Sequence, residues 1–232
     1  MEVGGELKSA LTSKPAVYVI GGTATIAAAY GLYKLWLYMR EEDEYFENLH
    51  SSKDQSERRV LIIGLDGAGK TRFARCFCKG RRRLSTTEET TIGFYVNSVM
   101  LGSIYLNMWD VGGSDMCRAY WKEFLLDLDA ICYVVDSSDA ARLDESRQEL
   151  HTFLTQKKTE NIPLIIVATK QDKPLAMKPD LVYSYMQLDN FAKTRPIHLV
   201  SVQAPDHGQR KGFMETYRIF ESLQKRGKHK SA

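Results

Sequence analysis

The chain has 232 residues, of which 44% are hydrophobic and 26% charged, and this balance excludes a disordered or collagen-like polymer. Its 32 basic and 29 acidic residues leave a net charge of +3, far below the basic excess of a dedicated nucleic-acid-binding protein. Four cysteines are too few for a secreted domain held together by disulfides, so we expect reduced thiols in a reducing compartment.

A long apolar segment near the amino terminus predicts a membrane anchor. Apart from Lys34, no charged residue occurs at 16–39. A helix of roughly 20 apolar residues crosses the hydrocarbon core of a bilayer. We therefore predict a short amino-terminal segment at 1–15 and a single transmembrane helix at 16–39. The alternative is a signal peptide cleaved after the small residues at 27–29, which the apolar residues beyond that point disfavour.

The rest of the chain predicts a polar, acidic linker at 40–58, one folded domain at 59–225 and a basic tail at 226–232. In the domain, short β-branched runs alternate with amphipathic stretches, which predicts an α/β fold with helices on both faces of a mostly parallel six-stranded sheet. The expected strands are Val60–Ile63, Phe94–Val99, Ile104–Trp109, Ile131–Val135, Leu164–Ala168 and Ile197–Val202. The expected helices are Arg72–Cys78, Ala119–Leu126, Ser146–Leu154, Leu181–Met186 and Phe213–Leu223. A hairpin turn at 100–103 predicts one antiparallel edge strand.

The first strand is followed by a phosphate-binding motif. Gly64–Thr71 reads GLDGAGKT and matches G-x-x-x-x-G-K-[ST] in full, between a predicted strand and a predicted helix. Its glycines let backbone N–H groups turn toward phosphate oxygens. Lys70 is expected to reach the β- and γ-phosphates, and the Thr71 hydroxyl to bind Mg²⁺. The nucleotide-binding residues predicted here are Asp66, Gly67, Gly69, Lys70, Thr71 and Arg72.

Later motifs indicate which nucleotide binds. In W-D-V-G-G, Asp110 is expected to hold Mg²⁺ through water and the Gly113 N–H to face the γ-phosphate, while Thr91 supplies a second hydroxyl to the metal. Asp172, after an apolar strand, can accept hydrogen bonds from guanine N1–H and N2–H₂, a contact that adenine does not make. We therefore predict GTP or GDP with Mg²⁺ as ligands. The residues assigned to the guanine end are Thr169, Lys170, Asp172 and Val202, the last within the segment Ser201–Ala204, which occupies the position where a backbone amide meets guanine O6.

Together GLDGAGKT, T-I-G-F and W-D-V-G-G resemble the ADP-ribosylation-factor-like (Arf-like) small GTPases, over about residues 59–225. With a membrane span before the domain, the chain looks most similar to the Arf-like nine and ten branch. The resemblance implies a P-loop small G domain that acts as a GTP-switched regulator at a membrane, with effector and exchange-factor proteins as partners. It also implies an aromatic patch for effectors at Phe94, Trp109 and Trp121, although core packing is favoured for Trp121. Because GTP and Mg²⁺ are cytosolic, we expect the domain to face the cytosol.

Several positions depart from the family's pattern or modify it. Glu2 stands where myristoylation needs glycine, so the membrane span is expected to replace the lipid. Ser114 stands where the family's glutamine orients the attacking water. Thr169 stands where an asparagine ties the base-binding strand to the phosphate-binding loop, and we expect it to be a weaker tie. Asp66 is expected to crowd the space that an inserted arginine needs beside the phosphates.

These residues support two functions. The first is a membrane-anchored switch with weak hydrolysis, in which GTP orders the loops around Thr91 and Gly113. The alternative is a hydrolysis-deficient binding module that holds GTP almost permanently, which Ser114 favours. An adenine-nucleotide kinase is a poorer third interpretation, since Asp172 suits guanine. Lys70 and Ser114 are the candidate catalytic residues, Ser114 with impaired activity.

Overall fold

The computed structural model describes residues 30, 56–79, 90–205 and 209–223. The predicted transmembrane helix lies outside them except for Tyr30, which is helical and exposed, and so do residues 40–55 of the linker and the basic tail. Within these described ranges, none of the helices has the length and apolar character that crossing a membrane requires. The chain divides into two compact units, Met1–Glu44 and Tyr45–Ala232, and the second contains the sheet.

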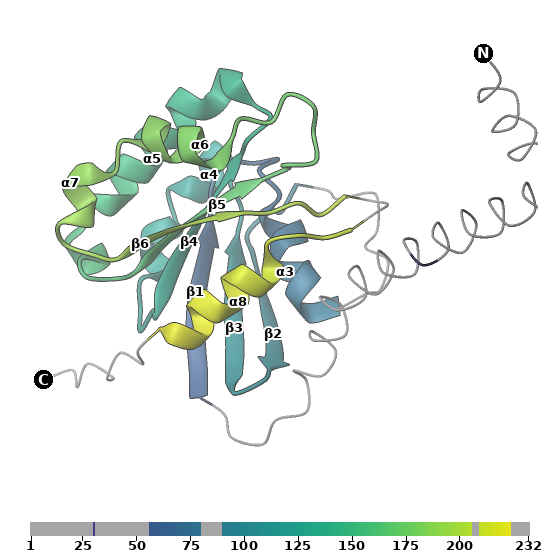
Figure 1. The fold of residues 1–232 in the computed structure, drawn as a ribbon. Helices are drawn as coiled ribbons and strands as arrows, with labels where there is room; N and C mark the ends of the chain where they lie inside the picture. The colour runs from purple at the N-terminus through teal and green to yellow at the C-terminus, as the bar shows by residue number, and fades with distance from the viewer. Residues whose placement is uncertain (1–29, 31–55, 80–89, 206–208, 224–232) are drawn as a thin grey trace, which may run out of the picture. The chain divides into compact units, whose positions relative to one another are not determined.

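A six-stranded sheet forms the centre of the second unit, in the order β2-β3-β1-β4-β5-β6 (Figure 1). The strands are β1 (Ser56–Ile63), β2 (Phe94–Leu101), β3 (Ile104–Val111), β4 (Ala130–Asp136), β5 (Leu164–Thr169) and β6 (Ile197–Ser201). Only β2 runs antiparallel to its neighbour, β3, and it lies at the edge of the sheet. The predicted α/β fold with a mostly parallel six-stranded sheet and all six predicted strands are confirmed. β1 begins at Ser56, so it includes residues that we had assigned to the linker.

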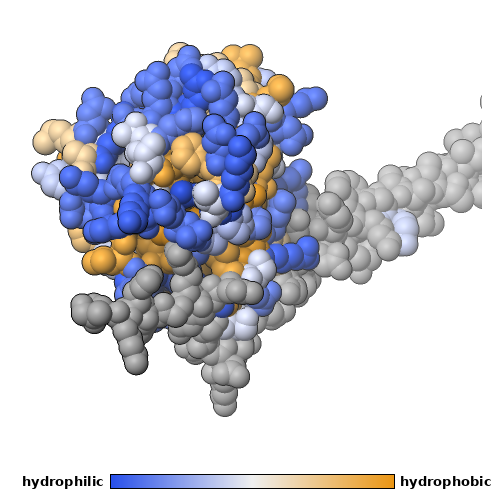
Figure 2. All heavy atoms as spheres, turned by 90° about the vertical axis from the view of Figure 1, so that its left-hand side faces the viewer, coloured by the Kyte–Doolittle hydropathy of each residue, from blue (hydrophilic) through white to orange (hydrophobic). Residues whose placement is uncertain are grey.

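Helices cover both faces of this sheet. One layer consists of α3 (Lys70–Lys79) and α8 (Phe213–Ser222), and the other contains α5 (Leu143–Leu154) and α6 (Pro179–Met186) (Figure 1). Alternate residues of β1 divide between them, because Val60 and Ile62 pack with the first layer and Leu61 and Ile63 with the second. A strand buried on both faces reads as a continuous apolar run, which is why β4 and β5 were recognisable in the sequence. On the face that Figure 2 shows, polar side chains cover most of the described surface, with hydrophobic atoms between them.

The predicted helix at Ala119–Leu126 is wrong. The chain instead forms a four-residue helix, α4 (Asp115–Arg118), and then a 3-10 turn, η2 (Trp121–Phe124). Trp121 explains the break, because its indole is only 2% exposed and its Nε1–H donates to the Gly112 carbonyl at 2.9 Å. A helix through these positions would not keep that tertiary hydrogen bond, so the turn forms around the buried indole.

Shorter elements complete the fold. They are η3 (Ala140–Arg142), η4 (Lys157–Thr159) and α7 (Asp189–Ala192), none of which the sequence analysis predicted. α5 begins at Leu143 and α6 at Pro179, each earlier than expected. Proline suits the first turn of a helix, since its missing N–H has no intrahelical partner there. The helices at 72–78 and 213–223 are confirmed with small changes in their ends.

Candidate functional site

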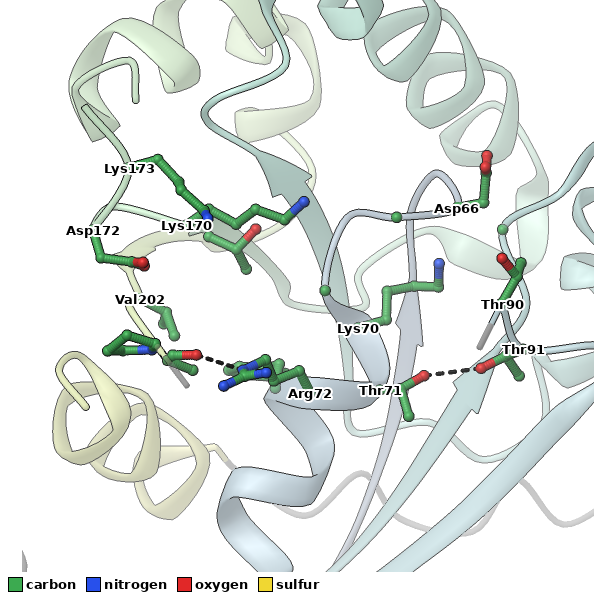
Figure 3. Close-up of a pocket in the computed structure, with 17 residues that line it drawn as sticks. Asp66, Lys70, Thr71, Arg72, Thr90, Thr91, Lys170, Asp172, Lys173 and Val202 are labelled. Atoms are coloured by element: carbon green, nitrogen blue, oxygen red, sulfur yellow. Dashed lines mark hydrogen bonds between the residues drawn. The ribbon is translucent and has the colours of Figure 1, made fainter. Parts of the chain in front are cut away.

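A cavity of about 520 Å³ opens where the phosphate-binding loop, the segment before β2 and the loops after β5 and β6 come together (Figure 3). It brings together most of the residues that the sequence predicted. Those that line it are Asp66, Gly67, Gly69, Lys70, Thr71, Arg72, Thr91, Gly113, Thr169, Lys170, Asp172 and Val202. The same lining also includes Thr90, Lys173, Ala204 and Pro205, which had not been assigned. Asp110 lies directly behind this lining, bonded to Thr71.

A buried lysine marks one end of the cavity. Lys70 is 5% exposed, and its Nζ donates to the Gly64 and Leu65 carbonyls at 3.0 and 2.8 Å. Burial lowers the pKa of its ammonium to about 8, since desolvation disfavours the charged form. Gly67 and Gly69 have φ values of 71° and 88°, which glycine adopts without strain. A cation beside a glycine-rich loop at the start of a helix is a site for phosphate oxygens.

Three oxygen-bearing side chains meet beside this lysine. Thr71 Oγ1 donates to Asp110 Oδ2 at 2.6 Å, and the Thr71 and Thr91 hydroxyl oxygens are 2.9 Å apart. Asp110 is fully buried, which raises the pKa of its carboxyl. Among the described residues its Oδ1 has no hydrogen-bond partner, although a buried carboxylate oxygen normally has one. Hard oxygen ligands around an unsatisfied carboxylate fit Mg²⁺, which the two hydroxyls would hold, with Asp110 acting through water.

The W-D-V-G-G segment packs directly on the phosphate-binding loop. The Asp66 N–H donates to the Gly113 carbonyl at 3.2 Å. A Cβ at Gly113 would lie 2.3 Å from the Gly64 carbonyl oxygen and 2.4 Å from the Asp66 nitrogen, so only glycine fits. Ser114 does not line the cavity; its carbonyl instead accepts backbone N–H groups from Cys117 and Arg118, at the start of α4. The structure therefore brings Gly113 to the phosphate end but places no Ser114 side chain in it.

The Asp66 carboxylate is held by arginines. Arg142 Nη2 lies 2.6 Å from Asp66 Oδ1, and Arg118 Nη2 lies 3.6 Å from the same oxygen. Its hydrogen bond to Arg142 holds the pKa of the Asp66 carboxyl below its ordinary value. Two arginines of the chain itself therefore occupy the surroundings of Asp66, and the expectation that this residue leaves no space for an inserted arginine stays a prediction.

Arg118 was missed because its partners are far apart in the sequence. Its guanidinium pairs with Glu145 at 2.8 Å and with Glu149 at 3.3 Å, both on α5. Its Nε–H also donates to the Gly113 carbonyl at 2.7 Å. Arg118 therefore joins the W-D-V-G-G segment to α5, a role that no local sequence pattern indicates.

At the other end of the cavity, Thr169 ties β5 to the phosphate-binding loop. It is 5% exposed, and its single O–H is shared between the Ala68 carbonyl, at 2.7 Å, and the Val135 carbonyl, at 2.9 Å. Lys170 follows with a φ of 57° and pairs with Asp136 at 2.5 Å. The tie that the family makes with asparagine is thus present here with a hydroxyl.

Both residues predicted to contact the guanine base, Asp172 and Val202, line the cavity. Asp172 lines the cavity, as the predicted base contact requires. Val202 also lines it, but its N–H donates to the Ala168 carbonyl at 2.9 Å. This N–H is therefore engaged within the sheet, and the contact of an amide of Ser201–Ala204 with guanine O6 stays a prediction.

The predicted aromatic patch is partly correct. Phe94 is 48% exposed and stacks on Trp109, with ring centroids 5.8 Å apart. The third ring is Phe124, 5.1 Å from Phe94 and 5.9 Å from Trp109, because Trp121 lies in the core. The preference for core packing at Trp121 is confirmed.

Comparisons with known proteins agree with the geometry of the cavity. The sequence profile of the ADP-ribosylation factor family matches residues 43–220. ADP-ribosylation factor-like protein 2 of Arabidopsis thaliana is 34% identical over 152 residues, which cover 66% of this chain and 80% of that protein. ADP-ribosylation factor-like protein 3 of Chlamydomonas reinhardtii is 35% identical over 152 residues, which cover 66% of this chain and 84% of that protein.

One solved structure shows the same fold. The small GTPase Arl6 (BBS3) of Trypanosoma brucei, determined with the nucleotide analogue GppNp, superposes with a TM-score of 0.60 at 21% sequence identity. The match covers 73% of this chain and the whole of that chain.

Proposed function

Because this chain belongs to the ADP-ribosylation factor family of small GTPases, we propose that its cavity binds GTP and GDP with Mg²⁺ and that the protein is a membrane-anchored regulatory switch. The observation that carries the ligand assignment is the unsatisfied Asp110 Oδ1 beside the Thr71 and Thr91 hydroxyls. A Mg²⁺ ion there would satisfy this oxygen and neutralise phosphate charge next to Lys70. The relative solved with GppNp supports a nucleotide as the anion.

Guanine specificity rests on the other end of the cavity. Asp172 lines it and offers carboxylate oxygens to N1–H and N2–H₂ of guanine. Thr169 holds the strand before it against the phosphate-binding loop. The two ends are therefore fixed at one distance, so that a molecule with both a guanine base and phosphates fits better than either part alone.

The membrane anchor is the finer part of the proposal. It is supported by the length and the apolar character of the segment at 16–39. The same features support placement near the Arf-like nine and ten branch, with the G domain facing the cytosol. Full-length protein should stay in the membrane pellet after carbonate extraction, and a chain that lacks residues 1–40 should be soluble. Release of the full-length protein at high pH would contradict the span.

A hydrolysis-deficient module that stays loaded with GTP is the second candidate, and Ser114 favours it. The serine lies outside the cavity lining, and its side chain has no amide with which to orient water. Nucleotide extracted from purified full-length protein separates the two functions. Exchangeable GDP with slow turnover of added GTP supports the switch, and GTP that persists without turnover supports the module. A preference for ATP contradicts both.

A further inference from the structure

Arg72 crosses the cavity from its phosphate side to its base side. The residue directly follows Thr71 in the first turn of α3, yet its Nε–H donates to the carbonyl of Ala204, in the loop after β6 (Figure 3). Both residues line the cavity. A single side chain thus connects the helix that begins at the phosphates with a loop 132 positions further along the chain.

That loop forms one wall of the base side. After β6 ends at Ser201, the Val202 N–H bonds to Ala168, and Gln203 forms a backbone pair with Lys211 at 3.2 and 3.0 Å. These bonds fix residues 202 and 203 to the sheet and to the segment before α8. The Arg72 bond is made one residue further, to Ala204, and comes from the phosphate side. The position of this wall relative to the phosphates therefore depends on Arg72.

The charge of Arg72 also points to an anion. The first turn of α3 contains Lys70 and Arg72 and no acidic residue. Cations at a helix amino terminus are unfavourable, because the helix dipole places partial positive charge there. The first turn of α3 therefore concentrates positive charge at the end of the helix where an anion is favoured.

We propose that Arg72 is a positioning residue that holds the loop at Val202–Ala204 against the phosphate side and so slows release of a bound guanine nucleotide. The inference rests on the proposed function, because it assigns a role within the same nucleotide cavity. It concerns the Arg72 side chain, whereas the sequence analysis had assigned the residue only to the phosphate-binding segment.

Release of fluorescent GDP from full-length protein in detergent tests this role. In Arg72→Met, which keeps an unbranched apolar chain but no donor, release should be about tenfold faster, the change that loss of one net hydrogen bond gives. Arg72→Lys keeps the charge but not the geometry of the Nε–H, so it should restore only part of the wild-type lifetime. Arg218→Met, at an exposed position on α8, is the matched control and should release GDP like wild type.

A second measurement separates this role from a general structural one. Without nucleotide, Arg72→Met should unfold close to the wild-type temperature, because the lost hydrogen bond to Ala204 is offset by the removal of a cation from the helix amino terminus. Wild-type GDP release from Arg72→Met overturns the proposal, and so does faster release that comes with a matching loss of stability in the nucleotide-free protein. If the wild-type protein binds no guanine nucleotide, the proposed function fails, and this inference fails with it. If the wild-type protein binds GDP and the Arg72 variants release it at the wild-type rate, only this inference fails.

Discussion

Replacing Thr169 by valine should shorten the lifetime of the nucleotide complex. Valine keeps the shape of the side chain and removes only the hydroxyl, which donates to the Ala68 carbonyl at 2.7 Å. Ala68 is 1% exposed, so its carbonyl would lose a buried donor. Leaving one buried carbonyl unsatisfied costs about 2 kcal/mol, which corresponds to about thirtyfold in an equilibrium constant. Because this bond joins the base side to the phosphate side, we expect GDP release to be faster by up to that factor.

The assay is the decay of fluorescence when labelled GDP dissociates into an excess of unlabelled GTP. Thr169→Ser keeps the hydroxyl and is the matched control, with release expected close to wild type. Thr169→Asn supplies two N–H donors, where threonine supplies one, and should slow release. Wild-type release from the valine variant would refute the reasoning, since the hydroxyl would then contribute nothing. Equal or faster release from the asparagine variant would mean that threonine is already a full substitute.

Three further predictions concern the phosphate end. We expect the wild-type rate of single-turnover GTP hydrolysis to lie below the order of 10⁻⁴ per second known for Ras, and Ser114→Gln should raise it. An unchanged rate in this variant would remove the main support for a permanently loaded module. Gly113→Ala should lower the free energy of urea unfolding by more than about 2 kcal/mol, because its Cβ would meet backbone atoms at 2.3–2.4 Å, whereas Ser114→Ala should leave it nearly unchanged. Nucleotide binding at pH 8 should take up about half a proton, since the pKa of Lys70 is about 8 without phosphates and rises beside them. The affinity for nucleotide should therefore fall as the pH rises above 8. Calorimetry in buffers of different ionisation enthalpy measures the proton uptake.

Contiguous motifs were the part of the site that the sequence predicted best. Lys70 and Thr71 are fixed by a strand, a glycine loop and a helix that follow one another directly, so their positions need no distant contact. Thr91 and Asp110 were predicted at the same site because Mg²⁺ binds oxygen ligands, which hydroxyl and carboxylate groups supply. The structure joins Thr71, Thr91 and Asp110 by hydrogen bonds, and Lys70, which precedes Thr71, donates to carbonyls of the phosphate-binding loop.

Directions of side chains and amides were not predictable where a distant partner decides them. Asp66 was expected beside the phosphates, but its hydrogen bond to Arg142, 76 positions away, which helps to decide where its carboxylate lies, could not be predicted. Ser201–Ala204 was expected to supply a backbone amide for guanine O6, but the segment itself does not indicate that the parallel register of β5 and β6 directs the Val202 N–H to Ala168. The helix at Ala119–Leu126 failed for the same reason, since the indole of Trp121 is bound to a carbonyl outside the segment.

The two ends of the cavity are held together by different kinds of contact, and this difference explains why the chain can depart from its family at Thr169. At the phosphate end, backbone packs on backbone: a Cβ at Gly64 would lie 2.2 Å from the Val134 carbonyl oxygen, and one at Gly113 would lie 2.3 Å from Gly64. No side chain can replace hydrogen there. At the base end, the ties run from side chains to carbonyls, as from Thr169 to Ala68. A carbonyl accepts a hydrogen bond from a hydroxyl, an amide or a guanidinium, so threonine can stand where asparagine is usual without loss of the connection.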